Sequence, residues 1–204
     1  MTVGGRDEGR TAGMAALLRE VRACRFCAPH LAQGARPVVQ ASATARLLVI
    51  GQAPGSRAHA GGRGWDDDSG ERLRGWLGLD DATFYDAAQV ALVSMGLCYP
   101  GKGASGDLPP RPECAPRWHR ALFSQMPDIR LTLLVGHHAQ RAYLLPALRR
   151  TMTEAVRAIE DMPEGIVALP HPSWRSRIWM GHNPWFEQEI VPILQARVRA
   201  ALSG

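Results

Sequence analysis

The sequence predicts an α/β fold whose mostly parallel sheet is covered by helices on both faces. Four short apolar runs alternate with segments of helical spacing. The runs lack polar alternation, as expected for strands that are buried on both faces. Each run leads directly into a polar or glycine-rich turn. The 204 residues are therefore expected to form one domain over residues 11–204, after a disordered N-terminus at residues 1–10.

Two helices and two strands are expected in the first half of the chain. Residues 11–27 place apolar side chains on one side of a helix. The run "ARLLVIG" at 45–51 reads as a buried strand that a glycine ends, and a second strand follows at 90–96. A short helix is predicted between them at 69–79, with Ser69 as its capping residue.

The second half continues the same alternation. Its expected elements, in order, are a loop at 99–110, a helix at 111–126 that begins near Pro116, a strand at 131–136, two short helices around Pro146 within 137–159, a strand at 165–170 and a closing helix at 183–202 that is interrupted near Pro192.

The turns that follow the four strands predict where a ligand binds. They read "GQAPG", "SMGLCYPG", "GHH" and "HPSW". In folds of this class, ligands bind at the carboxyl ends of the strands. We therefore expect these four turns to meet at one edge of the sheet.

The composition bounds the function only loosely. The net charge of +5 and the pI near 9.5 hint at a polyanionic partner. Nearly all of the positive charge is arginine, which suits bidentate phosphate contacts but equally reflects GC-rich coding. No run of apolar residues is long enough to span a membrane, and the N-terminus lacks the apolar core of a signal peptide. We expect a cytoplasmic protein.

The four cysteines follow an uneven spacing. Cys24 and Cys27 form a C-x2-C pair, and after a gap of 70 residues Cys98 and Cys114 form C-x15-C. Disulfides are not expected in the cytoplasm. The wide second pair is a poor match to the knuckles of a zinc site, whereas iron–sulfur ligation tolerates long gaps. The residues alone leave an iron–sulfur cluster, zinc and unligated core cysteines about equally open.

The motifs in combination resemble the uracil-DNA glycosylase superfamily, most closely its iron–sulfur-containing bacterial and archaeal branches. The resemblance rests on "LLVIGQAPG" after the first strand, "HPS" after the last strand and the spacing of the cysteines. It covers the chain from about Cys24 to the closing helix. It implies a three-layer α/β/α sandwich around a four-stranded parallel sheet.

The resemblance also implies an activity, a partner and a cofactor. Members hydrolyse the bond between a damaged pyrimidine and deoxyribose after flipping the base out of the DNA helix. By this resemblance, the protein would be a monofunctional, monomeric repair enzyme that acts at the nucleoid on DNA containing uracil or another deaminated base. The four cysteines would hold a 4Fe–4S cluster with a structural role, and the loop between Cys98 and Cys114 would present Lys102 to DNA.

A carboxylate that activates water is missing from its place in the first motif. In some branches of the family the third position of this motif is that aspartate, but here it is Ala53. Other branches carry the carboxylate in a segment like "RGWDDDSG", where the matching residue is Asp67. Asp66 and Asp68 are close competitors. The segment could instead be a solvated acidic turn that caps a helix.

The resemblance assigns the base-binding residues to the first two turns. Gly51 and Ala53 would bring the backbone close to the flipped base, and Gln52 would contact its edge. Trp65 would stack on the base, unless it is a core residue. Ser94 stands where many members have an asparagine that reads uracil. A hydroxyl cannot make the bidentate contact of an amide, so hypoxanthine, xanthine or another deaminated base becomes a plausible substrate.

The turn "HPSW" supplies the remaining site residues. His171 matches the family histidine that donates to the pyrimidine O2, although a satisfied loop histidine is the alternative. Ser173 is placed to bind a phosphate, and Trp174 and Arg175 form the tip that enters the space left by the base. Arg177 is expected to contact the DNA backbone or to pack near the final helix.

Two other function classes remain open at this point. Ala53 and Ser94 also fit a non-catalytic or covalent uracil-DNA-binding protein on the same fold. A metal-cluster protein with a different nucleotide-like ligand is the third class. Release of a damaged base separates the enzyme from the other two.

Overall fold

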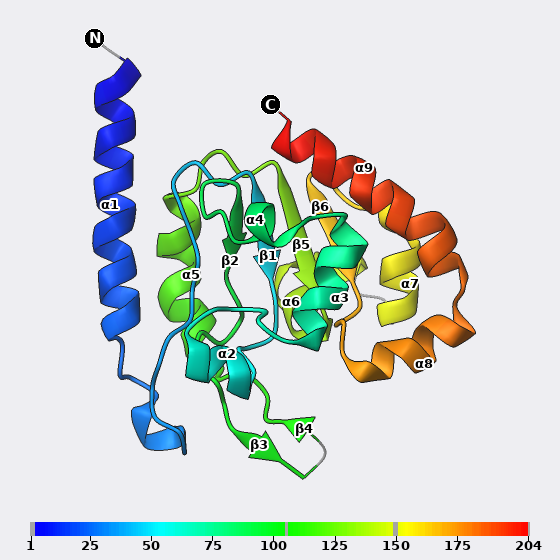
Figure 1. The fold of residues 1–204 in the computed structure, drawn as a ribbon, viewed down its shortest axis with the longest axis horizontal. Helices are drawn as coiled ribbons and strands as arrows, with labels where there is room; N and C mark the ends of the chain where they lie inside the picture. Colours follow the sequence, from blue (N-terminus) through cyan, green and yellow to red (C-terminus); the bar gives the residue numbers. More distant parts are fainter. Residues whose placement is uncertain (1–2, 105, 149–150, 204) are drawn as a thin grey trace.

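Four parallel strands form the centre of the molecule, in the order β2-β1-β5-β6 (Figure 1). They are β1 (Leu47–Ile50), β2 (Val90–Leu92), β5 (Leu131–Val135) and β6 (Ile166–Leu169). The computed structural model describes residues 3–104, 106–148 and 151–203. All four strands lie within the predicted ranges, and the predicted α/β sandwich is confirmed.

The strand order creates a crevice at the carboxyl edge of the sheet. From β1 the chain first adds β2 on one side and then returns to add β5 on the other side. The turns after β1 and β5 therefore diverge, which is the place where ligands bind in open α/β sheets. The turn after β1 carries Gln52, and the turn after β5 carries His137.

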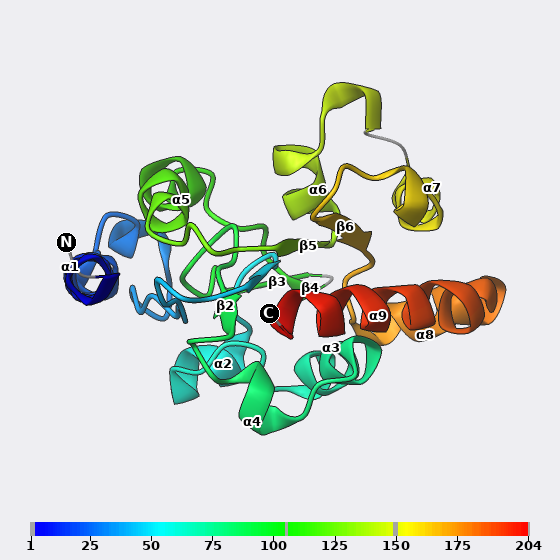
Figure 2. The ribbon, with the colours of Figure 1, turned by 90° about the horizontal axis from the view of Figure 1, so that it is seen from above.

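The sheet is buried on both faces because successive side chains of each strand point to opposite sides. Leu47 and Val49 belong to a core with α3 (Asp68–Leu77) and α9 (Val191–Leu202). Leu48 and Ile50 belong to a second core with α1 (Val3–Ala23), α5 (Cys114–Ser124) and α6 (His137–Tyr143). Figure 2 shows α5 and α6 on one side of the sheet and α3 and α9 on the other. This double burial explains why the strands read as unbroken apolar runs.

The other elements surround this sheet. They are α1 (Val3–Ala23), α2 (Ser56–Gly61), α4 (Asp81–Phe84), the antiparallel strands β3 (Lys102–Gly103) and β4 (Gly106–Asp107), α5 (Cys114–Ser124), α6 (His137–Tyr143), α7 (Met152–Arg157) and α8 (Trp174–His182), with short 3-10 turns at Ala28–His30, Pro146–Leu148 and Ile159–Asp161 and a π-helical turn at Phe186–Ile190. None of the described helices is both long and apolar enough to cross a membrane.

The expected helices are present, with shifted ends. The first begins at Val3, inside the segment expected to be disordered, and ends at Ala23; residues 1–2 lie outside the described part. The cap of α3 is Asp67 rather than Ser69, since the Asp67 side chain accepts a hydrogen bond from the Gly70 N–H. The closing segment has its expected interruption, because a π-helical turn ends at Ile190, just before Pro192.

Apart from short 3-10 and π-helical turns, four described elements were not predicted: α2, α4, α8 and the β3–β4 hairpin. Residues 174–182 form α8, although "WRSRIWMGH" has no apolar stripe and buries only Ser176. The expected loop at 99–110 contains the β3–β4 hairpin, whose strands have two residues each. In Figure 1, α2, the hairpin and α8 all lie at the end of the sheet where β1 leads into α2. Three of these four elements therefore border the carboxyl edge.

Candidate active site

A cavity of about 620 Å³ opens at the carboxyl edge of the sheet. Its walls come from the turn after β1, the segment before α3, the β3–β4 hairpin, the start of α6 and the loop after β6. Most of the expected site residues line it: Gln52, Ala53, Trp65, Asp67, Ser94, His171, Ser173, Trp174 and Arg175. Gly51, Lys102 and Arg177 are not part of this lining.

The turn after β1 is held against the end of β2 by backbone hydrogen bonds. The Met95 N–H donates to the Gly51 carbonyl, and the Gly96 N–H donates to the Gln52 carbonyl, both at 2.9 Å. A Cβ atom on Gly51 would lie only 2.6 Å from the Trp65 ring. Gly51 therefore lies beneath the indole and not in the cavity lining. Its lack of a side chain lets the indole lie directly on the turn.

Trp65 is held in an unusual backbone conformation. Its φ is +58°, in the left-handed region that bulky residues avoid. The Trp65 carbonyl accepts hydrogen bonds from the Tyr85 hydroxyl at 2.9 Å and from Arg74 at 3.3 Å. A Cβ atom on Gly70 would lie 1.7 Å from the same carbonyl oxygen, so this position requires glycine. Surrounding contacts thus impose the position of the indole, which is the pattern expected of a functional side chain.

The three consecutive aspartates have different environments. Asp66 accepts a hydrogen bond from Arg63 at 2.6 Å, and this bond lowers the pKa of Asp66. The side chain of Asp68 is 91% exposed, and its nearest cation is Arg57 at 3.4 Å. Only Asp67 lines the cavity. Its Oδ1 caps α3, and its Oδ2 lies 3.4 Å from the point where a Cβ of Gly55 would be.

His171 lies beside Trp65 in the lining of the cavity. The two ring centroids are 5.6 Å apart, with an angle of 30° between the ring planes. The His171 carbonyl accepts hydrogen bonds from the Ser173 N–H and the Ser176 hydroxyl. Burial lowers the pKa of the imidazole, and the charges of Asp67 and Asp107 oppose this effect. The imidazole is therefore neutral at pH 7.

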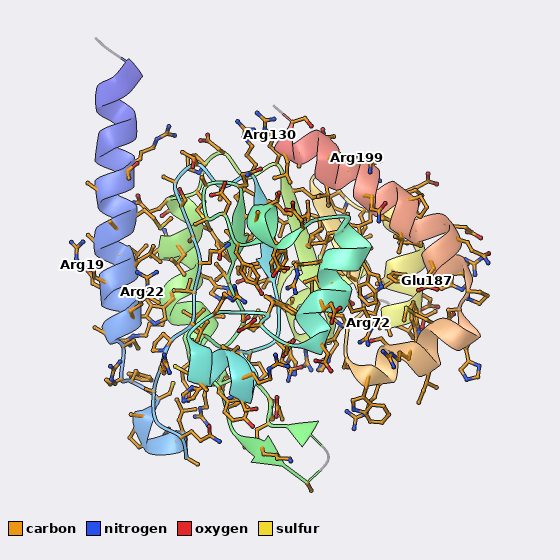
Figure 3. The ribbon with its side chains drawn as sticks, in the orientation of Figure 1. Arg19, Arg22, Arg72, Arg130, Glu187 and Arg199 are labelled. Carbon is orange, nitrogen blue, oxygen red and sulfur yellow. The ribbon has the colours of Figure 1, made fainter. Side chains whose placement is uncertain are left out.

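Arg72 joins the loop after β6 to α3. Its guanidinium donates to the carbonyls of Pro172 at 2.6 Å and Ser173 at 3.1 Å. Figure 3 labels Arg72 on the part of α3 that lies near α8. Because Asp67 caps the N-terminus of the same helix, α3 ties the carboxylate and the histidine loop into one unit.

The first turn of α8 forms one rim of the cavity. Ser173 precedes the helix, and Trp174 is 63% exposed. The Arg175 guanidinium lies 4.8 Å from the centroid of the Trp174 ring. Arg177 is exposed on the same helix, outside the cavity.

Ser94 lines the cavity, and a hydrogen bond from His119 holds its backbone carbonyl. Its hydroxyl oxygen is 3.3 Å from the Cβ position of Gly51. His119 Nε2 donates to the Ser94 carbonyl at 3.0 Å, which makes Nδ1 the acceptor from the Tyr143 hydroxyl. His119 is buried, and burial lowers its pKa. Sequence reasoning gave His119 no role, because these contacts join residues from three separate elements.

Three further titratable residues of the cavity lining had been given no role in the sequence analysis. Asp107 lies at the end of β4, and His137 and His138 begin α6 with their ring centroids 3.9 Å apart. The "GHH" turn after a buried strand was a signal for the two histidines. Asp107 carried no such signal, because it sits in a loop whose hairpin was not predicted.

The four cysteines line a second, small cavity of about 20 Å³. All four thiols are free, and the Leu97 N–H donates to Cys114 Sγ at 3.3 Å. Both cysteine pairs therefore reach the same cavity. Among the described residues, no three histidine, cysteine or acidic side chains form a group that could hold a metal ion.

A family model described as the uracil DNA glycosylase superfamily matches residues 38–195. The matched range contains all residues that line the first cavity. It begins after Cys24 and Cys27.

Proposed function

The chain belongs to the uracil-DNA glycosylase superfamily, and from this premise we propose that it is a DNA glycosylase that removes uracil or another deaminated base. The observation that carries the proposal is the meeting of the turn after β1 with the loop after β6. These turns place Asp67, Trp65 and His171 around one cavity, with the Trp65 and His171 rings 5.6 Å apart. Hydrolysis at a nucleobase inside DNA requires such a slot, since the reactive atoms are buried in the base stack.

The flipped base would stack on Trp65 above the turn after β1. Stacking on an aromatic ring stabilises a base by about 1–3 kcal/mol and tolerates different bases. Gln52 and the hydroxyl of Ser94 would contact the base edge, whereas Gly51 lies beneath the indole. Because a serine hydroxyl reads that edge less strictly than an amide does, we propose a substrate range that includes hypoxanthine and xanthine.

The reaction would be a hydrolysis with water as nucleophile. Asp67 Oδ2 orients the water and accepts its proton, and the water oxygen bonds to C1′ of the sugar. The C1′–N bond breaks, and its electron pair leaves with the base. The neutral His171 donates a hydrogen bond to the oxygen of the base on which negative charge develops. The base then takes a proton from solvent, which leaves an abasic site.

The DNA backbone would bind at the rim of the cavity. Ser173 and Arg175 would contact phosphates, and Trp174 would fill the space left by the base. Arg177 and Lys102 lie outside the cavity lining and would act only as backbone contacts. Lys102 is the only lysine in the sequence. No lysine amine lines the described cavity, which supports a monofunctional enzyme without Schiff-base chemistry.

We further propose that Cys24, Cys27, Cys98 and Cys114 hold a 4Fe–4S cluster. The donor set fits, because four free thiols line one cavity and a backbone N–H donates to one sulfur. The side chains would turn inward to bind. The cluster would tie the segment after α1 to α5 and would take no part in the hydrolysis. About four iron and four sulfide ions in each chain are expected; stoichiometric zinc would contradict this assignment.

A panel of oligonucleotides tests the function. Duplexes and single strands that carry uracil, hypoxanthine, xanthine or a thymine mismatch are incubated with the protein and treated with alkali. The proposal expects strand cleavage at one or more of the deaminated bases. A shifted band in a mobility assay without any cleavage would instead identify a DNA-binding protein on this fold.

A further inference from the structure

Asp107 lies at the rim of the candidate active site, on a different element from Asp67 and His171. It ends β4 in the β3–β4 hairpin, where its backbone pairs with Lys102. The hairpin brings Asp107 into the lining of the same cavity as Asp67, although 40 residues separate the two in the sequence. Asp107 is exposed at the mouth of the cavity, and the Arg175 guanidinium lies 3.8 Å from the Cβ position of its neighbour Gly106.

The carboxylates of Asp67 and Asp107 have matching arrangements. In Asp67, Oδ1 accepts a hydrogen bond from the Gly70 N–H at 2.9 Å. In Asp107, Oδ1 accepts a hydrogen bond from the Tyr99 hydroxyl at 3.1 Å. Each Oδ2 faces the turn after β1, where they lie 3.4 Å (Asp67) and 4.0 Å (Asp107) from the Cβ position of Gly55. Each carboxylate thus has one anchored oxygen and one oxygen directed at the same spot.

Tyr99 keeps Asp107 in this orientation. The ring of Tyr99 is 3% exposed, and burial raises the pKa of its hydroxyl. The hydroxyl therefore remains a donor at neutral pH. The ring of His59 lies beside it, with the centroids 6.0 Å apart. A carboxylate that served only as a surface charge would not need a buried donor.

We propose that Asp107 is a second catalytic carboxylate, which shares the attacking water with Asp67 over Gly55. The inference rests on the proposed glycosylase function and adds a residue to it. Glycoside hydrolases likewise use two carboxyl groups beside the bond that breaks, one of which activates the water. The glycine at position 55 leaves the space between the two Oδ2 atoms open.

The two carboxylates would have different roles in the reaction. Asp67 accepts the proton of the water as its oxygen bonds to C1′. Asp107 accepts a hydrogen bond from the second proton of the water, and its carboxylate stabilises the positive charge that develops on the sugar. The electron pair of the C1′–N bond leaves with the base, as in the reaction above. Arg175, whose guanidinium lies beside the neighbouring Gly106, would offset the repulsion between Asp107 and nearby phosphates.

Single-turnover base release tests this assignment. Wild type, Asp107→Asn, Asp67→Asn and the double variant are compared on the best oligonucleotide of the panel, with affinity for the same DNA measured separately. We expect Asp107→Asn to lower the rate on the order of 100-fold. Its affinity for DNA should be unchanged or higher, because a negative charge is removed. The double variant should lose less than the product of the two single losses, since both residues act on one water.

Two further variants separate catalysis from structure. Asp68→Asn is the matched control, because this neighbouring aspartate is 91% exposed and lies outside the cavity; its rate should equal that of wild type. Tyr99→Phe keeps the buried ring and removes the donor, and its rate should fall part of the way towards that of Asp107→Asn.

The outcomes also distinguish this inference from the function on which it rests. An active wild type with an equally active Asp107→Asn variant overturns the role of Asp107 and leaves the glycosylase function in place. The same holds if Asp107→Asn changes only the affinity for DNA. If wild type releases no base from any oligonucleotide of the panel, both proposals are wrong.

Discussion

Asp67 combines a structural and a proposed chemical task in one side chain. Oδ1 caps α3, and Oδ2 faces the cavity. The Asp67→Asn variant would keep the cap, because asparagine caps helices as well as aspartate does. We expect this substitution to leave the melting temperature nearly unchanged and to lower base release on the order of 100- to 10,000-fold, since an amide accepts no proton. If Asp66→Asn were inactive and Asp67→Asn active, the wrong carboxylate has been chosen.

His171 predicts how the activity depends on pH. Burial lowers its pKa below the ordinary value, so the neutral donor prevails at pH 7 and above. Activity should be lost as the pH falls below about 6.5 and through the lowered pKa, because the imidazole then becomes charged. Rates measured from about pH 4.5 to 8.5 test this. His171→Gln should lower the rate roughly 100- to 1,000-fold and remove the loss of activity at low pH. If the variant lost activity at low pH as wild type does, another group would be responsible for that loss.

The sequence identified the site residues that follow a strand or a motif directly. Asp67 and His171 are of this kind, and both line the cavity. Asp107 and His119 could not be found in this way, because their positions depend on how a hairpin and two helices pack against remote segments. Lys102 was expected to face DNA from the same loop, but it is Asp107 that the hairpin brings to the cavity.

At the scale of elements, α3 positions most of the site. Gly70 admits the Trp65 carbonyl, and a Cβ atom there would lie 1.7 Å from its oxygen. The carbonyl oxygen belongs to the backbone and cannot turn away from a new Cβ atom as the end of a flexible side chain could. Gly70→Ala should therefore lower the free energy of unfolding by about 3 kcal/mol and displace the indole of Trp65. Gly75→Ala is the matched control in the same helix, because nothing lies within 4 Å of its Cβ position.

Chemical denaturation of the two variants measures the difference. Gly75→Ala should stabilise the protein by about 0.5–1 kcal/mol, because alanine loses less backbone entropy in a helix. Equal effects of the two substitutions would show that the close contact between Gly70 and Trp65 does not hold α3 in place.

The buried elements were predictable, whereas those at the rim were not. Strands that are apolar on both faces stand out in the sequence, and all four were found. In contrast, α8 exposes Trp174 and Ile178 to solvent, so it shows no apolar periodicity. The β3–β4 hairpin consists of two-residue strands rich in glycine. Elements that face a ligand rather than the core lack the pattern from which sequence reasoning starts.

At the scale of the molecule, the positive charge is not confined to the cavity edge. Figure 3 shows Arg19 and Arg22 on α1, and it shows Arg130 and Arg199 near the end of the sheet opposite α8. The net charge of +5 therefore could not locate a DNA-binding face. The position of the cavity does so, because DNA must approach the edge where the base enters.

Arginines at the two ends of the molecule should differ in their effect on DNA binding. Arg175→Ala should weaken binding several-fold and reduce the slope of log affinity against log salt by about one, because one phosphate contact is lost. Arg199→Ala is the control, since this exposed residue lies at the far end. Titrations from about 50 to 300 mM salt measure both slopes. Equal losses would indicate a binding face other than the cavity edge.

The release of free base under single-turnover conditions tests the central claim most directly. Wild-type protein in excess over oligonucleotides that carry uracil, hypoxanthine or xanthine is quenched at intervals, and mass spectrometry quantifies the free base and the remaining strand. The account predicts one free base for each abasic strand on at least one of these substrates, with the release abolished in the Asp67→Asn/His171→Gln double variant. Tight binding with no release from any of the three oligonucleotides, or release that the double variant retains, would contradict it.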